Sequence, residues 1–259
     1  MESLRAHAAF ICDMDGVLYH GDRLLPGAAE FVGWLQTSGK KFLFLTNSSN
    51  RSPQELRQKL QRVGIDVPVD HFYTSALATA SFLASQCPGG SAYVIGEAGL
   101  FNAIYTAGLT MDDVSPDYVV VGETRGYNYE KLERAAALVR GGARLIGTNP
   151  DLTDRTEAGI VPACGALVAP IELATDVKAY FVGKPNPLMM RHALKRLGAR
   201  REETVIVGDR MDTDIVAGVE AEIATVLVLS GVTSRADLPR FSYRPGLVLE
   251  GVGEIPPRA

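Results

Sequence analysis

The sequence predicts an α/β fold in which helices cover a parallel sheet. Short apolar runs rich in Val, Ile, Phe and Leu alternate with amphipathic stretches along the chain. This is the pattern of buried parallel strands joined by helical crossovers. With 259 residues, of which 46% are hydrophobic and 22% charged, the chain is long enough to bury a large core. The expected strands are 9–13, 41–45, 92–95, 118–121, 144–147, 179–182, 204–207 and 225–229.

The best-marked helix start follows the expected strand at 41–45. In "TNSSNRSPQELRQKL", Ser52 can cap a helix, Pro53 suits its first position and Glu55 completes a capping box. We therefore expect a helix that begins at Pro53.

Two interruptions of the pattern divide the chain. The first is "SQCPGG" at 85–90, and the second lies near "LATDVKAY" at 173–180. Because the segment between them has its own alternation of strands and helices, we expect a core in two parts, 1–87 and 177–259, with an inserted α/β domain at 88–176. One continuous large sheet is the alternative that these local signals leave open.

Charge, hydropathy and cysteine spacing argue against several classes of protein. The formal net charge is −4 with both signs mixed along the chain, which predicts no basic surface for a nucleic-acid polymer. No stretch approaches the roughly 20 apolar residues of a membrane span, and "MESLRAHAAF" lacks the apolar run of a secretory signal. Cys12, Cys87 and Cys164 are widely spaced, which is typical of reduced thiols. We expect a cytoplasmic protein that binds neither nucleic acid nor membrane; its oligomeric state, a homodimer included, stays open.

Two aspartates stand where the first expected strand ends. In "FICDMDGVLYHG", Asp13 and Asp15 follow an apolar run and precede a glycine. Side chains two apart on a strand point to the same face and lie about 6 to 7 Å apart, so the two carboxylates would lean toward one region. Ionised carboxylates repel each other there unless a cation or a basic side chain offsets the charge. The pair therefore predicts a counterion.

Polar residues also follow three other expected strands. "FLFLTN" ends at Thr46 and Asn47, "YFVGKP" contains Lys184, and "VIVGDRMDTD" contains Asp209 and Asp214. Ligands of open α/β sheets bind where the carboxyl ends of parallel strands meet, so we expect these groups to converge. Carboxylate oxygens in small number suit Mg²⁺ shared with a phosphate, and the lysine, the hydroxyl and nearby backbone amides suit the remaining phosphate oxygens. The sequence thus predicts a phosphoryl site.

The chemistry of phosphoryl transfer gives the two aspartates different roles. Asp13 could attack phosphorus once Mg²⁺ and Lys184 offset the repulsion between the anions, which would give an aspartyl-phosphate intermediate. Asp15 would protonate the leaving alkoxide and then activate the water that hydrolyses the intermediate. Most of the rate would come from positioning and charge neutralisation, because the loose transition state spreads charge over the equatorial oxygens.

Four motifs, in order, resemble those of the haloacid dehalogenase superfamily of phosphatases: "DMDGVL", "LTN", "GKP" and "GDRMDTD". Phrases such as "VVGETRGYNYEKL", "TNPD", "PACGAL" and "LVLSGVTS" extend the likeness to the NagD-like subfamily over nearly the full length. The resemblance implies a Rossmann-like, doubly wound core that is interrupted after the second motif by an α/β cap. It also implies that Thr46, Asn47 and Lys184 bind the phosphate.

The same resemblance implies a metal site. Asp13 would be the nucleophile and a Mg²⁺ ligand, and Asp15 would be the acid and base and bind Mg²⁺ through its backbone carbonyl. Asp209 would be the third protein ligand, and Asp214 would join the site through a water. One position departs from the family: Glu222 stands where relatives usually carry a glycine before the last core strand.

Substrate choice is expected to come from the inserted segment, because the core site recognises only a phosphate and Mg²⁺. There "TNPDLTDRTEAG" is interpreted as a polar loop, with Asp151 and Arg155 as candidates to contact the leaving group. The resemblance implies small phosphorylated metabolites, nucleoside 5′-monophosphates such as UMP first, with sugar, glycolate, glycerol or pyridoxal phosphates as alternatives. A phospho-aspartate signalling module is a second hypothesis, against which stands the order of Lys184 before Asp209 and the interrupting cap.

Overall fold

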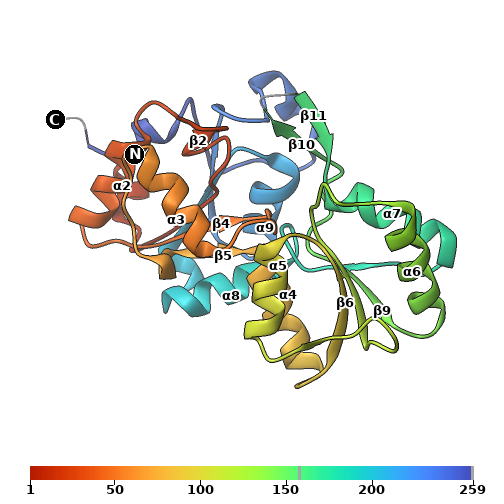
Figure 1. Cartoon of the computed structure of the whole chain (residues 1–259). Coiled ribbons are helices and arrows are strands. Elements are labelled where there is room, and N and C mark those ends of the chain that lie inside the picture. Colours follow the sequence, from red (N-terminus) through yellow and green to blue (C-terminus); the bar gives the residue numbers. More distant parts are fainter. Residues whose placement is uncertain (157–158, 258–259) are drawn as a thin grey trace. The chain divides into compact units, whose positions relative to one another are not determined.

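The computed structural model describes residues 1–156 and 159–257, which fall into two compact units (Figure 1). The first unit is built from Met1–Thr46, Leu56–Tyr73 and Lys184–Ala259, and the second from Asn47–Glu55 and Thr74–Gly183. Among the described residues, each unit has its own main sheet, of six strands in the first and five in the second. The predicted α/β class with parallel sheets is confirmed.

The first unit is organised around the strand that ends before Asp13. Its sheet contains β1 (Ala9–Cys12), β4 (Lys41–Thr46), β5 (Phe72–Thr74), β13 (Thr204–Gly208), β14 (Ala224–Val228) and β15 (Leu247–Leu249). The order is β15-β14-β13-β1-β4-β5, and β1 pairs in parallel with both β13 and β4. All four residues of β1 are buried, as in a parallel strand covered on both faces. The carboxyl ends of β1, β13 and β4 therefore lie side by side.

Helices surround this sheet, and local signals set their ends. They are α1 (Glu2–Ala6), α2 (Ala28–Thr37), α3 (Pro53–Arg62), α8 (Pro187–Leu197) and α9 (Val216–Glu220). The predicted start of α3 is confirmed: the Ser52 N–H donates to the Glu55 carboxylate at 2.7 Å, and the Glu55 N–H donates to Ser52 Oγ at 3.3 Å. This reciprocal pair satisfies two backbone donors that the first turn of a helix leaves open.

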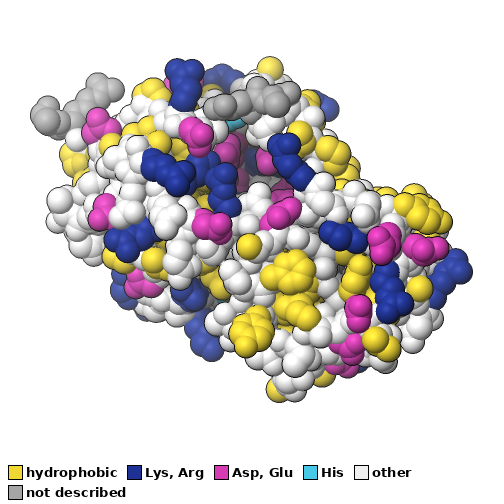
Figure 2. Space-filling view, viewed as in Figure 1, with side chains coloured by type: hydrophobic (Ala, Val, Ile, Leu, Met, Phe, Trp, Pro, Cys, Tyr) yellow, Lys and Arg dark blue, Asp and Glu magenta, His cyan; other side chains and the backbone are white. Residues whose placement is uncertain are grey.

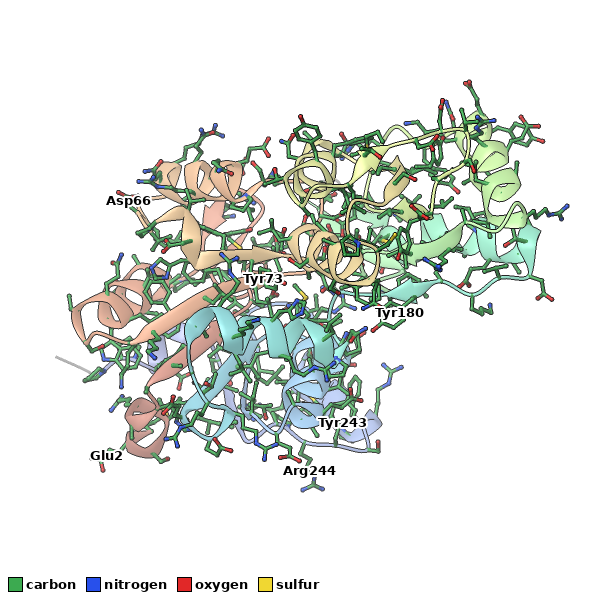
Figure 3. All side chains as sticks on the ribbon, turned by 90° about the horizontal axis from the view of Figure 1, so that it is seen from below. Glu2, Asp66, Tyr73, Tyr180, Tyr243 and Arg244 are labelled. Atoms are coloured by element: carbon green, nitrogen blue, oxygen red, sulfur yellow. The ribbon has the colours of Figure 1, made fainter. Side chains whose placement is uncertain are left out.

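Aromatic side chains fill much of the space between α2 and the sheet. The rings of Phe10 and Trp34 meet edge to face with centroids 5.4 Å apart, and Phe31 packs beside both. Glu2 and Arg244, by contrast, point away from the first unit (Figure 3). The apolar face of α2 thus packs against β1, the strand that leads to Asp13.

The turn between α9 and β14 forms without a glycine. Glu222 adopts a left-handed backbone conformation there, with φ of 55°, and its carboxylate forms an ion pair with Arg201. A residue with a Cβ is strained in this region of backbone space. The departure from the family pattern therefore leaves the turn in place at some cost in stability.

The second unit repeats the architecture on a smaller scale. Its sheet has the order β12-β9-β8-β6-β7 and its strands pair in parallel. The strands are β6 (Ser91–Ile95), β7 (Thr110–Met111), β8 (Tyr118–Val121), β9 (Arg144–Gly147) and β12 (Tyr180–Phe181). The helices are α4 (Ser75–Gln86), α5 (Ala98–Thr106), α6 (Tyr129–Arg140) and α7 (Cys164–Thr175).

The expected polar loop "TNPDLTDRTEAG" is wrong in part, because it contains a strand of a hairpin. β10 (Thr153–Thr156) pairs antiparallel with β11 (Gly159–Pro162), and Arg155 lies opposite Ile160. Residues 157–158 of the quoted stretch lie outside the described part of the chain. Nearly all side chains of β10 and β11 are exposed, so neither face carries the apolar alternation by which a strand is recognised.

Strands of only two or three residues also escaped the sequence pattern. β2 (Tyr19–His20) and β3 (Arg23–Leu24) form a small hairpin, and β5, β7 and β15 contribute only two or three residues each to the edges of the main sheets.

On the face drawn in Figure 2, Lys and Arg side chains are interspersed with Asp and Glu. Among the described residues, no helix combines the length and apolar character needed to cross a membrane.

Candidate active site

Three carboxylates meet at the carboxyl ends of β1 and β13. Asp13 follows β1, Asp209 follows β13, and Asp214 lies in the π-helical turn Met211–Ile215. One carboxylate oxygen from each lies within 4.8 Å of those of the other two. The parallel pairing of β1 with β13 produces this convergence, since the Asp13 N–H donates to the Val207 carbonyl at 2.8 Å. The fold thus brings Asp13, Asp209 and Asp214 together at these strand ends.

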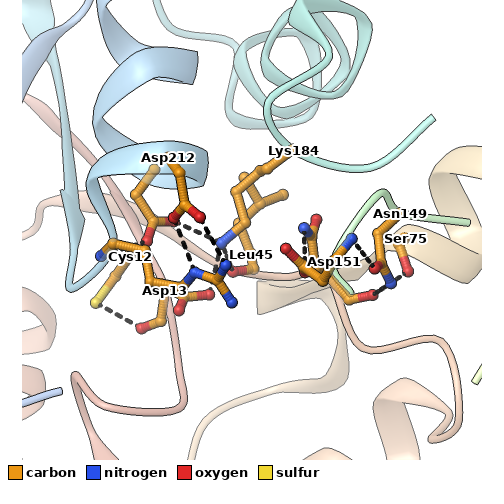
Figure 4. A network of polar contacts seen from close by, with 11 residues as sticks. Cys12, Asp13, Leu45, Ser75, Asn149, Asp151, Lys184 and Asp212 are labelled. Atoms are coloured by element: carbon orange, nitrogen blue, oxygen red, sulfur yellow. Dashed lines mark hydrogen bonds and ion pairs between the residues drawn. The ribbon is translucent and has the colours of Figure 1, made fainter. Parts of the chain in front are cut away.

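A buried lysine joins two of the three carboxylates. Lys184 Nζ donates to Asp13 Oδ1 at 2.7 Å, to Asp214 Oδ1 at 2.6 Å and to the Leu45 carbonyl at 3.4 Å (Figure 4). Only 3% of the lysine side chain is exposed. One ammonium against three carboxylates leaves an excess of negative charge in a buried place, which is unfavourable without a further cation.

Burial and mutual repulsion perturb the ionisation of this cluster. Burial, and after it the repulsion of Asp214, raise the pKa of Asp13 to about 7 against the attraction of Lys184. The pKa of Asp209 lies well above its ordinary value because the group is buried and Asp13 and Asp214 repel its charge. Burial by itself would lower the pKa of Lys184, but Asp13 and Asp214 raise it above the ordinary range. Lys184 therefore stays protonated, and its single positive charge is too small to offset the repulsion among the three carboxylates.

One of the two carboxylate oxygens of Asp209 has no hydrogen-bond donor among the described residues. Val232 N–H donates to Oδ2 at 2.6 Å, whereas Oδ1 is buried and has no hydrogen-bond partner among the described residues. A Cβ on either Gly16 or Gly231 would overlap the Asp209 carboxylate, so the backbone closes around it. An unpartnered buried carboxylate oxygen beside two further carboxylates fits a hard divalent cation such as Mg²⁺.

The Asp15 side chain does not belong to the acidic cluster. It is about half exposed, and its Oδ1 lies 3.5 Å from His20 Nδ1. Strand geometry failed as a guide here because β1 ends at Cys12, and Gly16 at φ 75° then turns the chain so that its N–H bonds the Tyr19 carbonyl. A carboxyl group in this position can exchange protons with solvent and with a ligand.

The residues expected to bind phosphate are divided between the two units. Thr46 ends β4 and is 8% exposed, and Lys184 is held as described above. Asn47, the next residue after Thr46, belongs to the second unit, where its Nδ2 donates to Asp151 Oδ2 at 2.9 Å. Arg155 lies on the exposed strand β10. Asp151 is thus tied to the Asn47 amide, while Arg155 is presented to solvent.

Sequence reasoning missed one half-buried acid in the second unit. Glu123 follows β8, and its carboxylate meets Ser48, Ser49 and Asn149. Burial raises its pKa to about 7, although the hydrogen bonds from Asn149, Ser49 and Ser48 lower it. A signal was present: "VVVGE" at 119–123 repeats the apolar strand, glycine and acid of "VIVGD" at 205–209.

Comparison with known proteins identifies the family. The sequence model of haloacid dehalogenase-like hydrolases matches residues 10–110, and a second, HAD-hydrolase-like model matches residues 181–255. The chain is 48% identical over 245 residues to the ribonucleotide monophosphatase NagD of Escherichia coli strain K12, covering 95% of this chain and 96% of that protein. The chain belongs to the haloacid dehalogenase-like hydrolases.

The sequence and fold of this haloacid dehalogenase-like hydrolase also match other phosphatases over nearly the full length of both chains. It is 44% identical over 252 residues to dihydroxyacetone phosphatase of Corynebacterium glutamicum strain R, covering 97% of this chain and 92% of that protein. The solved structure of NagD from the E. coli K-12 strain matches with a TM-score of 0.91 at 47% identity, over 97% of this chain and 99% of that one. The chain is a phosphoric monoester hydrolase of the NagD-like type, as predicted.

Proposed function

We propose that this enzyme is a Mg²⁺-dependent phosphomonoesterase that acts through an aspartyl-phosphate, with nucleoside 5′-monophosphates such as UMP as the leading substrate class. The observation that carries the proposal is the buried cluster of Asp13, Asp209, Asp214 and Lys184 at the ends of β1 and β13. It provides a nucleophile, a fixed cation and a set of oxygen ligands in one place.

The metal would be held by Asp13, Asp209 and the Asp15 carbonyl, and Asp214 would join the site through a water. The unpartnered Asp209 Oδ1 and the uncompensated negative charge support this assignment. When bound, Mg²⁺ would supply positive charge to the phosphoryl oxygens. Thr46, Asn47 and Lys184 would bind the remaining phosphate oxygens through a hydroxyl, an amide and an ammonium.

In the first half-reaction, a carboxylate oxygen of Asp13 forms a bond to phosphorus while the bond from phosphorus to the ester oxygen breaks. Lys184, at 2.7 Å from Asp13 Oδ1, favours the ionised form of this carboxylate and holds it in position against the repulsion of an incoming anion. Asp15 gives its proton to the departing ester oxygen, which the exposure of its side chain permits.

In the second half-reaction, the ionised Asp15 accepts a proton from a water that attacks phosphorus. The bond from phosphorus to Asp13 then breaks, which releases phosphate and restores both carboxyl groups to their starting states. The enzyme therefore turns over repeatedly, unlike a phospho-aspartate signalling module.

The second unit is proposed to act as the cap, with 88–176 as its main part, and to select the leaving group. Arg155 on the exposed strand β10 offers a planar group of N–H donors to a base or sugar, and Asp151 offers carboxylate oxygens. The relatives' names include a ribonucleotide monophosphatase and a dihydroxyacetone phosphatase. Sugar, glycolate, glycerol and pyridoxal phosphates remain the alternatives to nucleotides that the family resemblance implies.

A phosphate-release screen tests this proposal. The purified enzyme is assayed against nucleoside monophosphates, sugar phosphates and p-nitrophenyl phosphate, with EDTA and then with excess Mg²⁺. We expect many turnovers per protein with Mg²⁺, none with EDTA, and near-complete loss in Asp13→Asn, which keeps the fold but cannot attack phosphorus. Metal-independent hydrolysis, or substantial turnover by Asp13→Asn, would overturn the mechanism.

A further inference from the structure

The segment Asn47–Ser49 is anchored within the second unit through its backbone. The Asn47 carbonyl accepts hydrogen bonds from the Ser75 hydroxyl and from Asn149 Nδ2, the latter at 2.7 Å (Figure 4). Asn149 Oδ1 in turn accepts the Asp151 N–H at 3.1 Å. The second hydrogen of Asn149 Nδ2 is donated to Glu123, so the orientation of the Asn149 amide is fixed. The fixed amide in turn holds the Asn47 carbonyl in place.

Glu123 closes the network around this segment. Its Oε2 accepts the Ser49 N–H at 3.1 Å and lies 3.1 Å from the Ser48 hydroxyl, and its Oε1 accepts the second hydrogen of Asn149 Nδ2 at 3.0 Å. The backbone N–H of Glu123 returns a bond to Ser49 Oγ at 3.1 Å. One carboxylate therefore contacts the segment at two consecutive residues and also holds the amide that supports a third.

The neighbouring glycine permits this close approach. A Cβ on Gly122 would overlap Ser49 Oγ, so a larger residue would push the segment away from Glu123. Burial of a carboxylate among neutral donors is costly, and this is why burial raises the pKa of Glu123 to about 7. An apolar side chain would fill the same space at a lower free-energy cost of burial. We therefore attribute the presence of a carboxylate here to the hydrogen bonds that it accepts.

The geometry points to Glu123 as a positioning residue: it holds the backbone of Asn47–Ser49 in the conformation that presents the Asn47 side-chain amide to phosphate. This inference rests on the proposed function, which assigns phosphate binding to Asn47. Glu123 acts through the segment rather than on the substrate. A glutamine here keeps the size but can accept on one side only, and its NH₂ then faces either the Ser49 N–H or the Asn149 NH₂.

The test measures the inhibition constant of inorganic phosphate, together with KM and kcat for p-nitrophenyl phosphate, in the Mg²⁺-loaded enzyme. The variants are Glu123→Gln, Asn47→Ala and their combination. Glu97→Gln is the matched control, since Glu97 also accepts a hydroxyl, from Thr124 at 2.6 Å, and a backbone N–H, from Arg125 at 3.3 Å, and neither bond involves the segment. Melting temperatures are recorded for all four.

We expect Glu123→Gln to raise the inhibition constant of phosphate about tenfold, the usual effect of a lost hydrogen bond to a charged group, and to raise KM with it. The Glu97→Gln control should match the parent. The double variant should bind phosphate no more weakly than Asn47→Ala alone, because residues that act through one another are not additive. If Glu123→Gln does not fold, Ser49→Ala breaks the same network from its other side and should shift the constant in the same direction.

The outcomes separate the two proposals. A raised constant in Asn47→Ala with an unchanged one in Glu123→Gln, or fully additive effects in the double variant, would refute the positioning role and leave the proposed function standing. A lower melting temperature in Glu123→Gln with unchanged phosphate binding would show that the residue serves stability alone. An unchanged constant in Asn47→Ala would refute the phosphate assignment itself, and the positioning role with it.

Discussion

Replacement of Asp209 by asparagine tests whether the acidic cluster is a cation site. If it is, mutual repulsion of its carboxylates should destabilise the fold when no metal is bound. Carboxylate oxygens of Asp13 and Asp214 lie within 4.8 Å of an Asp209 oxygen. At that separation and an effective dielectric constant of about 20, each repulsion is worth about 3.5 kcal/mol. Lys184 offsets part of it through its bonds to Asp13 and Asp214. The substitution removes both repulsions that involve Asp209.

We expect Asp209→Asn to be more stable than the parent in EDTA at pH 8, by about 1 to 3 kcal/mol once the offset by Lys184 is allowed for. The asparagine oxygen can still accept the Val232 N–H, and its NH₂ can occupy the place of the unpartnered Oδ1 and donate toward the neighbouring carboxylates. For a chain of this length the gain corresponds to a rise in melting temperature of about 2 to 6 °C.

The pH dependence follows from the direction of the pKa shifts. Burial raises the pKa of Asp13 from its ordinary 3.8 to about 7, and that of Asp209 well above 3.8. A carboxyl group with a raised pKa contributes stability that is fully present below the ordinary value and is lost as the pH rises through the raised one. The parent without metal should therefore lose stability between about pH 4 and pH 8, and the advantage of Asp209→Asn should vanish near pH 4.

Thermal unfolding in EDTA across this pH range, followed by a Mg²⁺ titration at pH 8, provides the measurement. The parent should gain melting temperature with Mg²⁺, because a ligand that binds only the folded state stabilises it, and Asp209→Asn should gain little. Asp212→Asn is the control: Asp212 is exposed and paired with Arg210, and it lies outside the cluster. A variant less stable than the parent in EDTA at pH 8, or one with the same response to Mg²⁺, would refute the reasoning.

Further substitutions test separate parts of the structure. Asp15→Asn should slow the first-turnover burst for alkyl phosphates more than for p-nitrophenyl phosphate, because a nitrophenolate leaves with little need of a proton; equal losses would exclude Asp15 as the acid. Arg155→Ala and Asp151→Ala should each change the ranking of substrates by kcat/KM, because both side chains are proposed to contact the leaving group; the same loss for every substrate would contradict their role in selection. Glu222→Gly should raise the free energy of unfolding by about 0.5 to 1 kcal/mol, because relief of left-handed strain exceeds the entropy cost of glycine; a denaturant midpoint below that of the parent would contradict this.

The central strands could be predicted because burial on both faces demands a continuous apolar run. "AFIC" and "TVIVG" are such runs, and both are fully buried in the sheet of the first unit. The hairpin β10–β11 could not be predicted in this way, since "TDRT" is polar and exposed on both faces. What holds that hairpin is backbone pairing between two exposed strands, and pairing of this kind has no signature in hydropathy.

The candidate site was predictable where a residue directly follows a buried strand. Asp13 and Asp209 are brought together by the pairing of β1 with β13, and adjacency of these strands was the only assumption required. Asp15 lies two residues further on, beyond the end of β1, where the turn at Gly16 rather than the pleat of a strand decides its direction. Glu123 was missed because its importance depends on contacts with Ser48 and Ser49, over seventy positions away.

The chain passes between the two units after Thr46, Glu55, Tyr73 and Gly183. A chimera that grafted a relative's segment 88–176 would leave α4 behind, although α4 packs against α5 of the replaced segment. A larger graft that included everything from Asn47 to Gly183 would also replace Asn47, α3 and the residues that anchor the segment after Thr46. Exchange of whole modules is therefore a poor route to new substrates in this architecture, and point substitutions on the exposed hairpin β10–β11 are the less disruptive one.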